Sequence, residues 1–215
     1  MKVTSYRQDG TGDGGERFAF STENRARADQ LIARYPEGRQ ASAVIALLDL
    51  AQRQTGGWLP TAAIEHVAEV LQMAPIRVHE VATFYSMFNL KPVGKHLVQV
   101  CRTTPCWLRG AAELTETCRR KLGVNLGGTS EDGAFTLVEV ECLGACANAP
   151  MVQINDDYYE DLTPARLEEI LDDLKAGRDV PTGPQTGRTG SMPEGGPTTL
   201  TNVPPRAPAD TGKGA

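Results

Sequence analysis

The sequence predicts an α+β protein in which a small helical bundle precedes an α/β unit with a small mixed sheet. Residues 18–90 repeat apolar side chains at helical spacing. Residues 97–177 instead alternate short β-type runs with two helical stretches. Between these two patterns, Pro92 and Gly94 lie in a stretch with the composition of a linker.

Four short amphipathic helices are expected in the first half of the chain. Thr22, Ser42 and Thr61 are expected to cap the first three helices, and Pro75 suits the first turn of the fourth. The first helix is expected to bury Ala28, Ile32 and Tyr35. The last ends in the aromatic stretch 84–88, which we interpret as core packing. Short connections between four such helices favour a small bundle.

The pattern in the second half of the chain predicts strands separated by helices. A helix begins at Thr104-Pro105 and continues to about Leu122, and a final helix begins at Thr163-Pro164 and ends at Gly177. The predicted strands are 97–101, 135–140, 151–154 and a short fourth strand beginning at Tyr158. This order of elements indicates an α/β unit.

Composition excludes several classes of protein. The longest apolar run among the 215 residues, Ala43 to Leu48, is far shorter than the roughly 20 residues of a membrane-spanning helix. The polar, Gly-rich start shows neither a secretory signal nor a transit peptide, which favours a reducing compartment where cysteines are ligands or redox groups. A net charge of −5 argues against nucleic-acid binding.

Four segments follow from these patterns. Residues 1–17 are expected to form a disordered leader, 18–92 the bundle, 93–177 the α/β unit and 178–215 a Gly/Pro-rich tail. From residue 181 onward, 14 of 35 residues are Gly or Pro and five are charged, which favours disorder. The alternative is that the tail orders against neighbours on assembly.

The five cysteines divide into two pairs and one single residue. Cys101 and Cys106 enclose four residues, and Cys142 and Cys146 enclose three. Each pair begins where a predicted strand ends, so the four thiols converge if the two strands are neighbours in one sheet. Cys118 lies on the apolar face of a helix, and we expect it to be a buried core thiol. Four candidate ligands remain.

Four converging thiolates have three interpretations: a structural zinc ion, a [2Fe–2S] cluster or a redox dithiol. The redox dithiol normally requires Cys-x-x-Cys, which is absent, and zinc ribbons usually use two-residue spacings. Cys106 follows Pro105 in the first turn of a helix, where negative charge is stabilised. Small residues at 143–145 let backbone amides approach sulfur. These features favour the cluster, with a zinc-stabilised scaffold as the alternative.

Six segments carry a resemblance that spans about residues 18–177. They are similar to the 24 kDa subunit family of NADH:quinone oxidoreductase, the respiratory complex I. The cysteine segments are highly specific for that family and the helical ones support them. The six are YPEGRQ (35–40), LLDLAQRQ (47–54), GGW (56–58), EVATFY (80–85), CRTTPCWLRG (101–110) and ECLGAC with NAP (141–150).

The resemblance implies a fold, a cofactor and partners. It implies a thioredoxin-like ferredoxin domain in which Cys101, Cys106, Cys142 and Cys146 bind one [2Fe–2S] cluster. It further implies that the chain docks on a flavoprotein that carries FMN and NADH. This pair would lie in the peripheral arm, on the cytoplasmic side of a bacterial membrane, and would contact the membrane only through other subunits. Thioredoxin-like folds also often have a cis-proline before the strand facing the active loop, which predicts a cis bond at Pro150. The alternatives to a complex I subunit are the related subunits of NAD-linked hydrogenases and formate dehydrogenases.

No catalytic set emerges from the sequence. His66, His79 and His96 have no convincing carboxylate or serine partner in sequence, and we expect them to be structural or exposed. No Gly-rich dinucleotide motif follows a predicted strand. The resemblance implies that the chain is a one-electron carrier, a subunit of NADH:quinone oxidoreductase that exchanges electrons with FMN on its partner.

Overall fold

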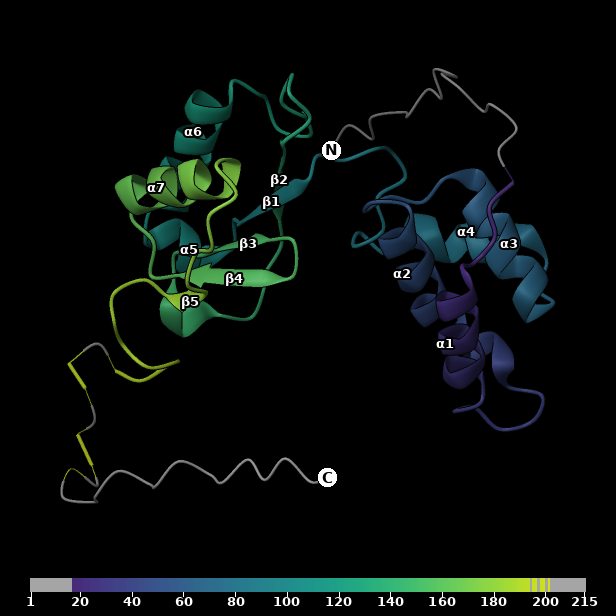
Figure 1. The fold of residues 1–215 in the computed structure, drawn as a ribbon. Helices are drawn as coiled ribbons and strands as arrows, with labels where there is room; N and C mark the ends of the chain where they lie inside the picture. Colours follow the sequence, from purple (N-terminus) through teal and green to yellow (C-terminus); the bar gives the residue numbers. More distant parts are fainter. Residues whose placement is uncertain (1–16, 194, 197, 200, 202–215) are drawn as a thin grey trace, which may run out of the picture. The chain divides into compact units, whose positions relative to one another are not determined.

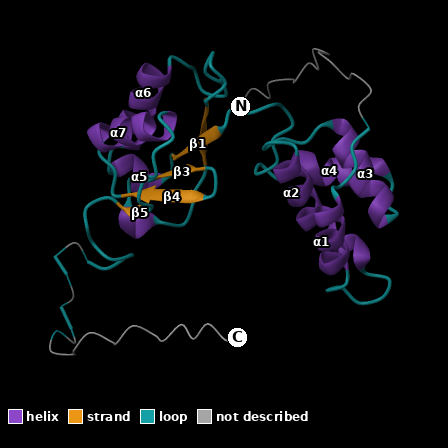
Figure 2. Ribbon diagram, viewed as in Figure 1, coloured by secondary structure: helices purple, strands orange, loops and turns teal. Residues whose placement is uncertain are grey.

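The chain divides after Lys95 into two compact units (Figure 1). The first contains helices, and the second combines helices with a sheet (Figure 2). No helix in the described part of the chain is long and apolar enough to cross a membrane. The predicted leader lies outside the described residues except for Arg17. The computed structural model describes residues 17–193, 195–196, 198–199 and 201.

The first unit is a bundle whose helices bury one apolar stripe each. The stripes meet in a single core, where Leu47, Leu48, Val67 and Val78 are fully buried. Its elements are α1 (Thr22–Ile32), the 3₁₀ turn η1 (Gln40–Ala43), α2 (Val44–Gln54), α3 (Thr61–Leu71) and α4 (Pro75–Phe84).

Three predicted helix caps in the bundle are wrong. Thr61 is the first residue of α3, whose N-cap is Pro60. Ser21, rather than Thr22, caps α1, because its hydroxyl accepts a hydrogen bond of 3.2 Å from the backbone N–H three residues on. Ser42 lies inside the 3₁₀ turn that leads into α2, so it caps no helix. Tyr35 is also misplaced, since it follows the end of α1 and is 37% exposed.

The aromatic stretch after α4 is largely exposed, contrary to the prediction of core packing. Phe84 is 79% exposed and Tyr85 39% exposed, whereas Phe88 is buried. The helix ends at Phe84, and its inward stripe is formed by Val78 and Ala82. Phe84 lies off that stripe and Tyr85 follows the helix end, so both leave the buried face, whereas Phe88 is packed in the core.

The second unit contains a mixed sheet of five strands in the order β2-β1-β3-β4-β5. β1 is parallel to β2, β3 is antiparallel to both β1 and β4, and β5 is parallel to β4. The predicted α+β class is confirmed. The elements are β1 (His96–Cys101), α5 (Thr104–Leu108), α6 (Ala111–Leu122), β2 (Phe135–Val140), the 3₁₀ turn η2 (Cys146–Asn148), β3 (Val152–Ile154), β4 (Asp157–Glu160), α7 (Pro164–Lys175) and β5 (Gly183–Pro184).

Helices α6 and α7 pack together against the sheet and form its main core (Figure 1). Alternate residues of β1, Val98 and Val100, are fully buried in this core, as expected for a strand with one covered face. Thr163 caps α7 with a hydrogen bond of 3.2 Å to the N–H of Arg166, and Pro164 occupies the first turn. The predicted start of this helix is confirmed.

One predicted helix is two in the structure. The stretch from Thr104 to Leu122 breaks into α5 and α6 at Gly110, whose φ of +98° is open to glycine and costly for other residues. The peptide bond between Ala149 and Pro150 is cis, as predicted.

Candidate functional site

The two cysteine segments meet at one edge of the sheet. β1 and β2 are parallel neighbours, and Cys101 at the end of β1 lies opposite Val140 at the end of β2. Cys142 follows two residues beyond β2. Cys106 lies in α5, which begins directly after β1, and Cys146 opens η2. The sheet register thus brings together segments far apart in sequence, as the pattern of strands and cysteines predicted.

The four thiols form two close pairs. The Sγ atoms of Cys142 and Cys146 are 3.5 Å apart. The thiols of Cys101 and Cys106 are hydrogen-bonded to each other. Cys118 is apart from both pairs, fully buried in the core formed by α6, α7 and the sheet. All five cysteines are free thiols.

The two pairs differ in exposure. Cys101 and Cys106 are each 1% exposed and belong to a small apolar cluster with Ala111, Ala149 and Met151. Cys142 and Cys146 are exposed. One side of the site is therefore sealed by side chains and the other faces outward.

Within the buried pair, the two thiols have opposite acidities. Burial would raise the pKa of Cys101, but hydrogen bonds from the Thr103 hydroxyl and from the backbones of Leu143 and Thr103 hold it below the usual value for a thiol. Burial and the neighbouring Cys101 raise the pKa of Cys106 to about 12. Cys101 is thus the thiol prepared to be an anion.

The exposed pair repeats this asymmetry. A hydrogen bond from the Gly144 backbone, then contacts with Cys146 and the Thr103 hydroxyl, lower the pKa of Cys142. The contact with Cys142 raises the pKa of Cys146. Backbone donors therefore point at sulfur in both pairs, as expected from the small residues at 143–145. Gly144 has a φ of +87°, a conformation that favours glycine.

The donor set fits a two-iron cluster better than a single metal ion. A zinc site gathers its four ligands around one point, whereas a [2Fe–2S] cluster takes two thiolates at each iron. Two close thiol pairs on neighbouring loops match the second arrangement.

Several supporting residues are missed by the sequence pattern. The Thr103 hydroxyl lies 3.5 Å from the Cys101 Sγ and also contacts Cys142. The Tyr158 hydroxyl donates a hydrogen bond of 2.7 Å to the Leu143 carbonyl and so anchors the second cysteine loop. Thr103 could have been noted from its place between two ligands. Tyr158 gave no signal, because its partner is fixed only by the fold.

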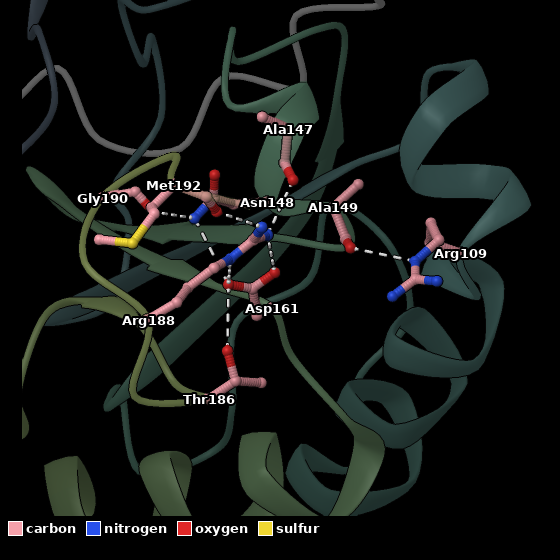
Figure 3. Close-up of polar contacts among 9 residues, drawn as sticks. All are labelled: Arg109, Ala147, Asn148, Ala149, Asp161, Thr186, Arg188, Gly190 and Met192. Atoms are coloured by element: carbon pink, nitrogen blue, oxygen red, sulfur yellow. Dashed lines mark hydrogen bonds and ion pairs between the residues drawn. The ribbon is translucent and has the colours of Figure 1, made fainter. Parts of the chain in front are cut away.

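The tail also reaches this region, contrary to the expected disorder. Gly183 pairs with Tyr159 of β4, and Arg188 lies beside Asp161 and the loop around Asn148 (Figure 3). The tail beyond residue 201 lies outside the described residues.

Two of the histidines pack against aromatic rings of their own units. His66 packs edge-on against Phe18 and Phe20, with ring centroids 5.4 and 5.2 Å away. His96 lies against Phe135 at 5.1 Å. Both contacts are with aromatic rings of the adjoining core.

Comparison of the sequence with known proteins shows the family to which the chain is similar. The family model described as thioredoxin-like [2Fe-2S] ferredoxin matches residues 28–175, a span that contains all four site cysteines. The E subunit of NADH-quinone oxidoreductase from Rickettsia bellii is 58% identical over 158 residues, covering 74% of this chain and 95% of that protein. The mitochondrial NADH dehydrogenase [ubiquinone] flavoprotein 2 of Dictyostelium discoideum is 50% identical over 187 residues, covering 87% and 76%.

A solved structure shares the fold at lower identity. The NAD⁺-reducing [NiFe]-hydrogenase in its air-oxidized state aligns with a TM-score of 0.55 at 19% identity. The match covers 63% of this chain and 23% of that chain. At this identity the likeness concerns the fold alone.

Proposed function

The chain belongs to the thioredoxin-like [2Fe-2S] ferredoxin family, as the electron-transfer E subunit of NADH-quinone oxidoreductase, and from this premise we propose that its four paired cysteines hold one cluster. The ligands are Cys101, Cys106, Cys142 and Cys146. The observation that carries the proposal is the meeting of two thiol pairs at the ends of parallel neighbours β1 and β2.

When bound, a [2Fe–2S] cluster supplies one-electron redox chemistry. The chain's own contribution is to hold four thiolates and to supply hydrogen bonds to sulfur. The Thr103 hydroxyl and the Gly144 amide donate to sulfur on the two sides of the site. The apolar cluster around Cys101 and Cys106 keeps water from the inner pair, and the outer pair faces the source or acceptor of electrons.

The partner in this proposal is a flavoprotein that carries FMN and NADH. Next to the site, Trp107 and Leu108 of α5 are 64% and 70% exposed. Large apolar side chains exposed beside a redox centre support a protein interface there. The relatives from Rickettsia bellii and Dictyostelium discoideum carry the names of NADH oxidoreductase subunits, which supports the same inference.

A second contact with partners is proposed on the bundle. Large apolar side chains are exposed on α4 and just after it, namely Ile76, Phe84, Tyr85, Met87 and Leu90. Deleting residues 18–90 should abolish co-purification with the flavoprotein, while the rest of the chain, with its tail, keeps the cluster. Retained co-purification would assign the interface to the sheet unit alone.

We also propose a peripheral position on the cytoplasmic side of a bacterial inner membrane, with contact to the membrane only through other subunits. The similarity to the corresponding bacterial subunits supports this. Fractionation of cells with and without the membrane subunits tests it, since the chain should leave the membrane fraction when they are missing.

Metal analysis and spectroscopy of anaerobically purified protein test the cluster directly. We expect iron and acid-labile sulfide in equal amounts and a rhombic EPR signal on reduction. Zinc without iron or sulfide would refute the proposal and support a zinc-stabilised scaffold. Cys142→Ser should lose or alter the signal, and Cys118→Ala, the matched control, should retain it.

A further inference from the structure

A buried arginine of the tail lies against the second cysteine loop. The side chain of Arg188 is 13% exposed and that of its partner Asp161 is 8% exposed. Asp161 directly follows β4, while Ala147 belongs to η2, which begins at Cys146. Arg188 touches both (Figure 3), so one side chain connects three separate segments.

All three guanidinium nitrogens of Arg188 are engaged. Nε donates a hydrogen bond of 2.6 Å to Oδ2 of Asp161, and one terminal nitrogen donates to Oδ1 of the same carboxylate. That nitrogen also donates to the Ala147 carbonyl at 2.7 Å, and the other donates to the Met192 carbonyl at 3.0 Å. A planar fork that bonds a carboxylate at two points is rigid, and lysine cannot reproduce it.

A second set of hydrogen bonds closes the same junction. The Asp161 N–H donates to the Asn148 carbonyl at 2.8 Å. The Asn148 side chain, 2% exposed, donates to the Gly190 carbonyl at 2.8 Å and to Asp161 at 3.4 Å. Asp161 has a φ of +54°, uncommon for a residue with a side chain, and these bonds hold it there. Loop and tail are therefore fixed to each other from both sides.

The path of the tail explains how Arg188 reaches this place. β5 pairs with β4 through Gly183 opposite Tyr159, and the Gln185 N–H donates a hydrogen bond of 3.0 Å to the Glu160 carbonyl. The chain then turns so that residues 186–192 pass over Asp161 and Asn148 (Figure 3). The tail is thus an additional edge of the sheet, attached beside the cysteine loop.

We propose that Arg188 is a positioning residue for Cys146. It fixes the carbonyl one residue after that cysteine, and through Asp161 and Asn148 it fixes the loop that follows. This inference rests on the proposed function, in which Cys146 is a cluster ligand. Groups that orient ligands from outside commonly affect metal affinity by about 10- to 100-fold when removed. Arg188 acts on the exposed pair, whose own surroundings hold it less firmly than the buried pair.

The test compares three variants of the full-length chain. Arg188→Gln removes the charge and most of the fork, and Arg188→Lys keeps the charge and loses the fork. Arg178→Gln is the matched control, because Arg178 is 60% exposed and bonds Asp173 rather than the loop. Three readouts are used: visible circular dichroism and EPR of the cluster, the rate of cluster loss to a chelator, and hydrogen exchange of the amides of Asn148 and Asp161 in the metal-free protein.

We expect Arg188→Gln to lose its cluster about tenfold faster or more, with altered visible dichroism and unchanged far-ultraviolet dichroism. Arg188→Lys should lie between it and wild type, and Arg178→Gln should match wild type. Faster exchange of the Asp161 amide in metal-free Arg188→Gln should accompany these changes. Wild-type rates, spectra and exchange in both Arg188 variants would overturn the proposal. If Arg188→Gln does not fold, Arg188→Lys alone decides.

The two proposals can fail separately. Wild-type protein that contains zinc and no sulfide would refute the proposed function, and hydrogen exchange in the metal-free variants would still report whether Arg188 fixes the loop. A wild-type cluster with no effect of Arg188 would leave the function standing and refute only the positioning role.

Discussion

Replacing Thr103 by valine should lower the reduction potential of the cluster. Valine keeps the shape of threonine and removes the hydroxyl, which lies 3.5 Å from the Cys101 Sγ and also contacts Cys142. A donor that faces sulfur stabilises the more negative, reduced form more than the oxidised form. Its loss therefore makes reduction less favourable. One hydroxyl touches both cysteine pairs, so the effect should exceed that of a donor to a single ligand.

The magnitude follows from the free energy of such a bond. Hydrogen bonds to charged groups are worth about 1.5–3 kcal/mol. Both oxidation states keep the bond, so we take about one third of this value, roughly 0.5–1 kcal/mol, as the difference between them. For a one-electron couple, a free-energy difference of about 1.36 kcal/mol corresponds to a shift of about 59 mV in reduction potential. The expected shift is thus about 20–45 mV downward.

The assay is a redox titration followed by EPR on anaerobically purified protein. Thr104→Val is the control, since Thr104 is the next residue, is exposed and undergoes the same chemical change. An unchanged or higher potential in Thr103→Val would refute the reasoning. An equal shift in Thr104→Val would show that the hydroxyl's contact with sulfur is not the cause.

Three further predictions concern the surroundings of the site. Cys118→Ala should lower the free energy of unfolding by about 1 kcal/mol, measured by denaturant titration, because it removes one fully buried atom; an altered cluster spectrum would contradict its exclusion from the ligands. Burial raises the pKa of the Cys118 thiol from 9.0 to about 12. The thiol therefore ionises in the unfolded protein at a lower pH than in the folded protein, so the stability advantage of wild type over Cys118→Ala should shrink above pH 9. An advantage that stays constant with pH would refute this. Gly144→Ala should cost about 1–2 kcal/mol, because Gly144 has a φ of +87°, and calorimetry showing no loss would contradict that strain.

The parts of the fold that were predictable are those encoded by neighbours in sequence. The Thr163-Pro164 start of α7 and the strand ends at the cysteines follow from local patterns and appear in the structure. The break at Gly110 was not foreseen, because a glycine inside a helical pattern is often tolerated and only the left-handed backbone there ends the helix. Tyr85 has helical spacing but follows the helix end, so periodicity alone misassigned it to the core.

The candidate site divides in the same way. Spacing and strand ends were enough to single out the four cysteines, which the structure arranges as two pairs. The contacts that support them were not predictable. Arg188 lies 41 residues from Ala147, in a stretch whose Gly and Pro content favours disorder, and only the pairing of β5 with β4 carries it there. Such long-range contacts have no local periodicity.

The late position of Arg188 in the chain also has a consequence for synthesis. Gly190 is made 42 residues after Asn148, the residue with which it shares a hydrogen bond. At about 5–20 residues per second, roughly 2–8 s separate their additions to a nascent chain. During that interval all four cysteines have been polymerised and the tail that fastens their second loop has not. Until that tail has been added, the second cysteine loop lacks the contacts with Arg188 and Gly190 that hold it in the longer chain.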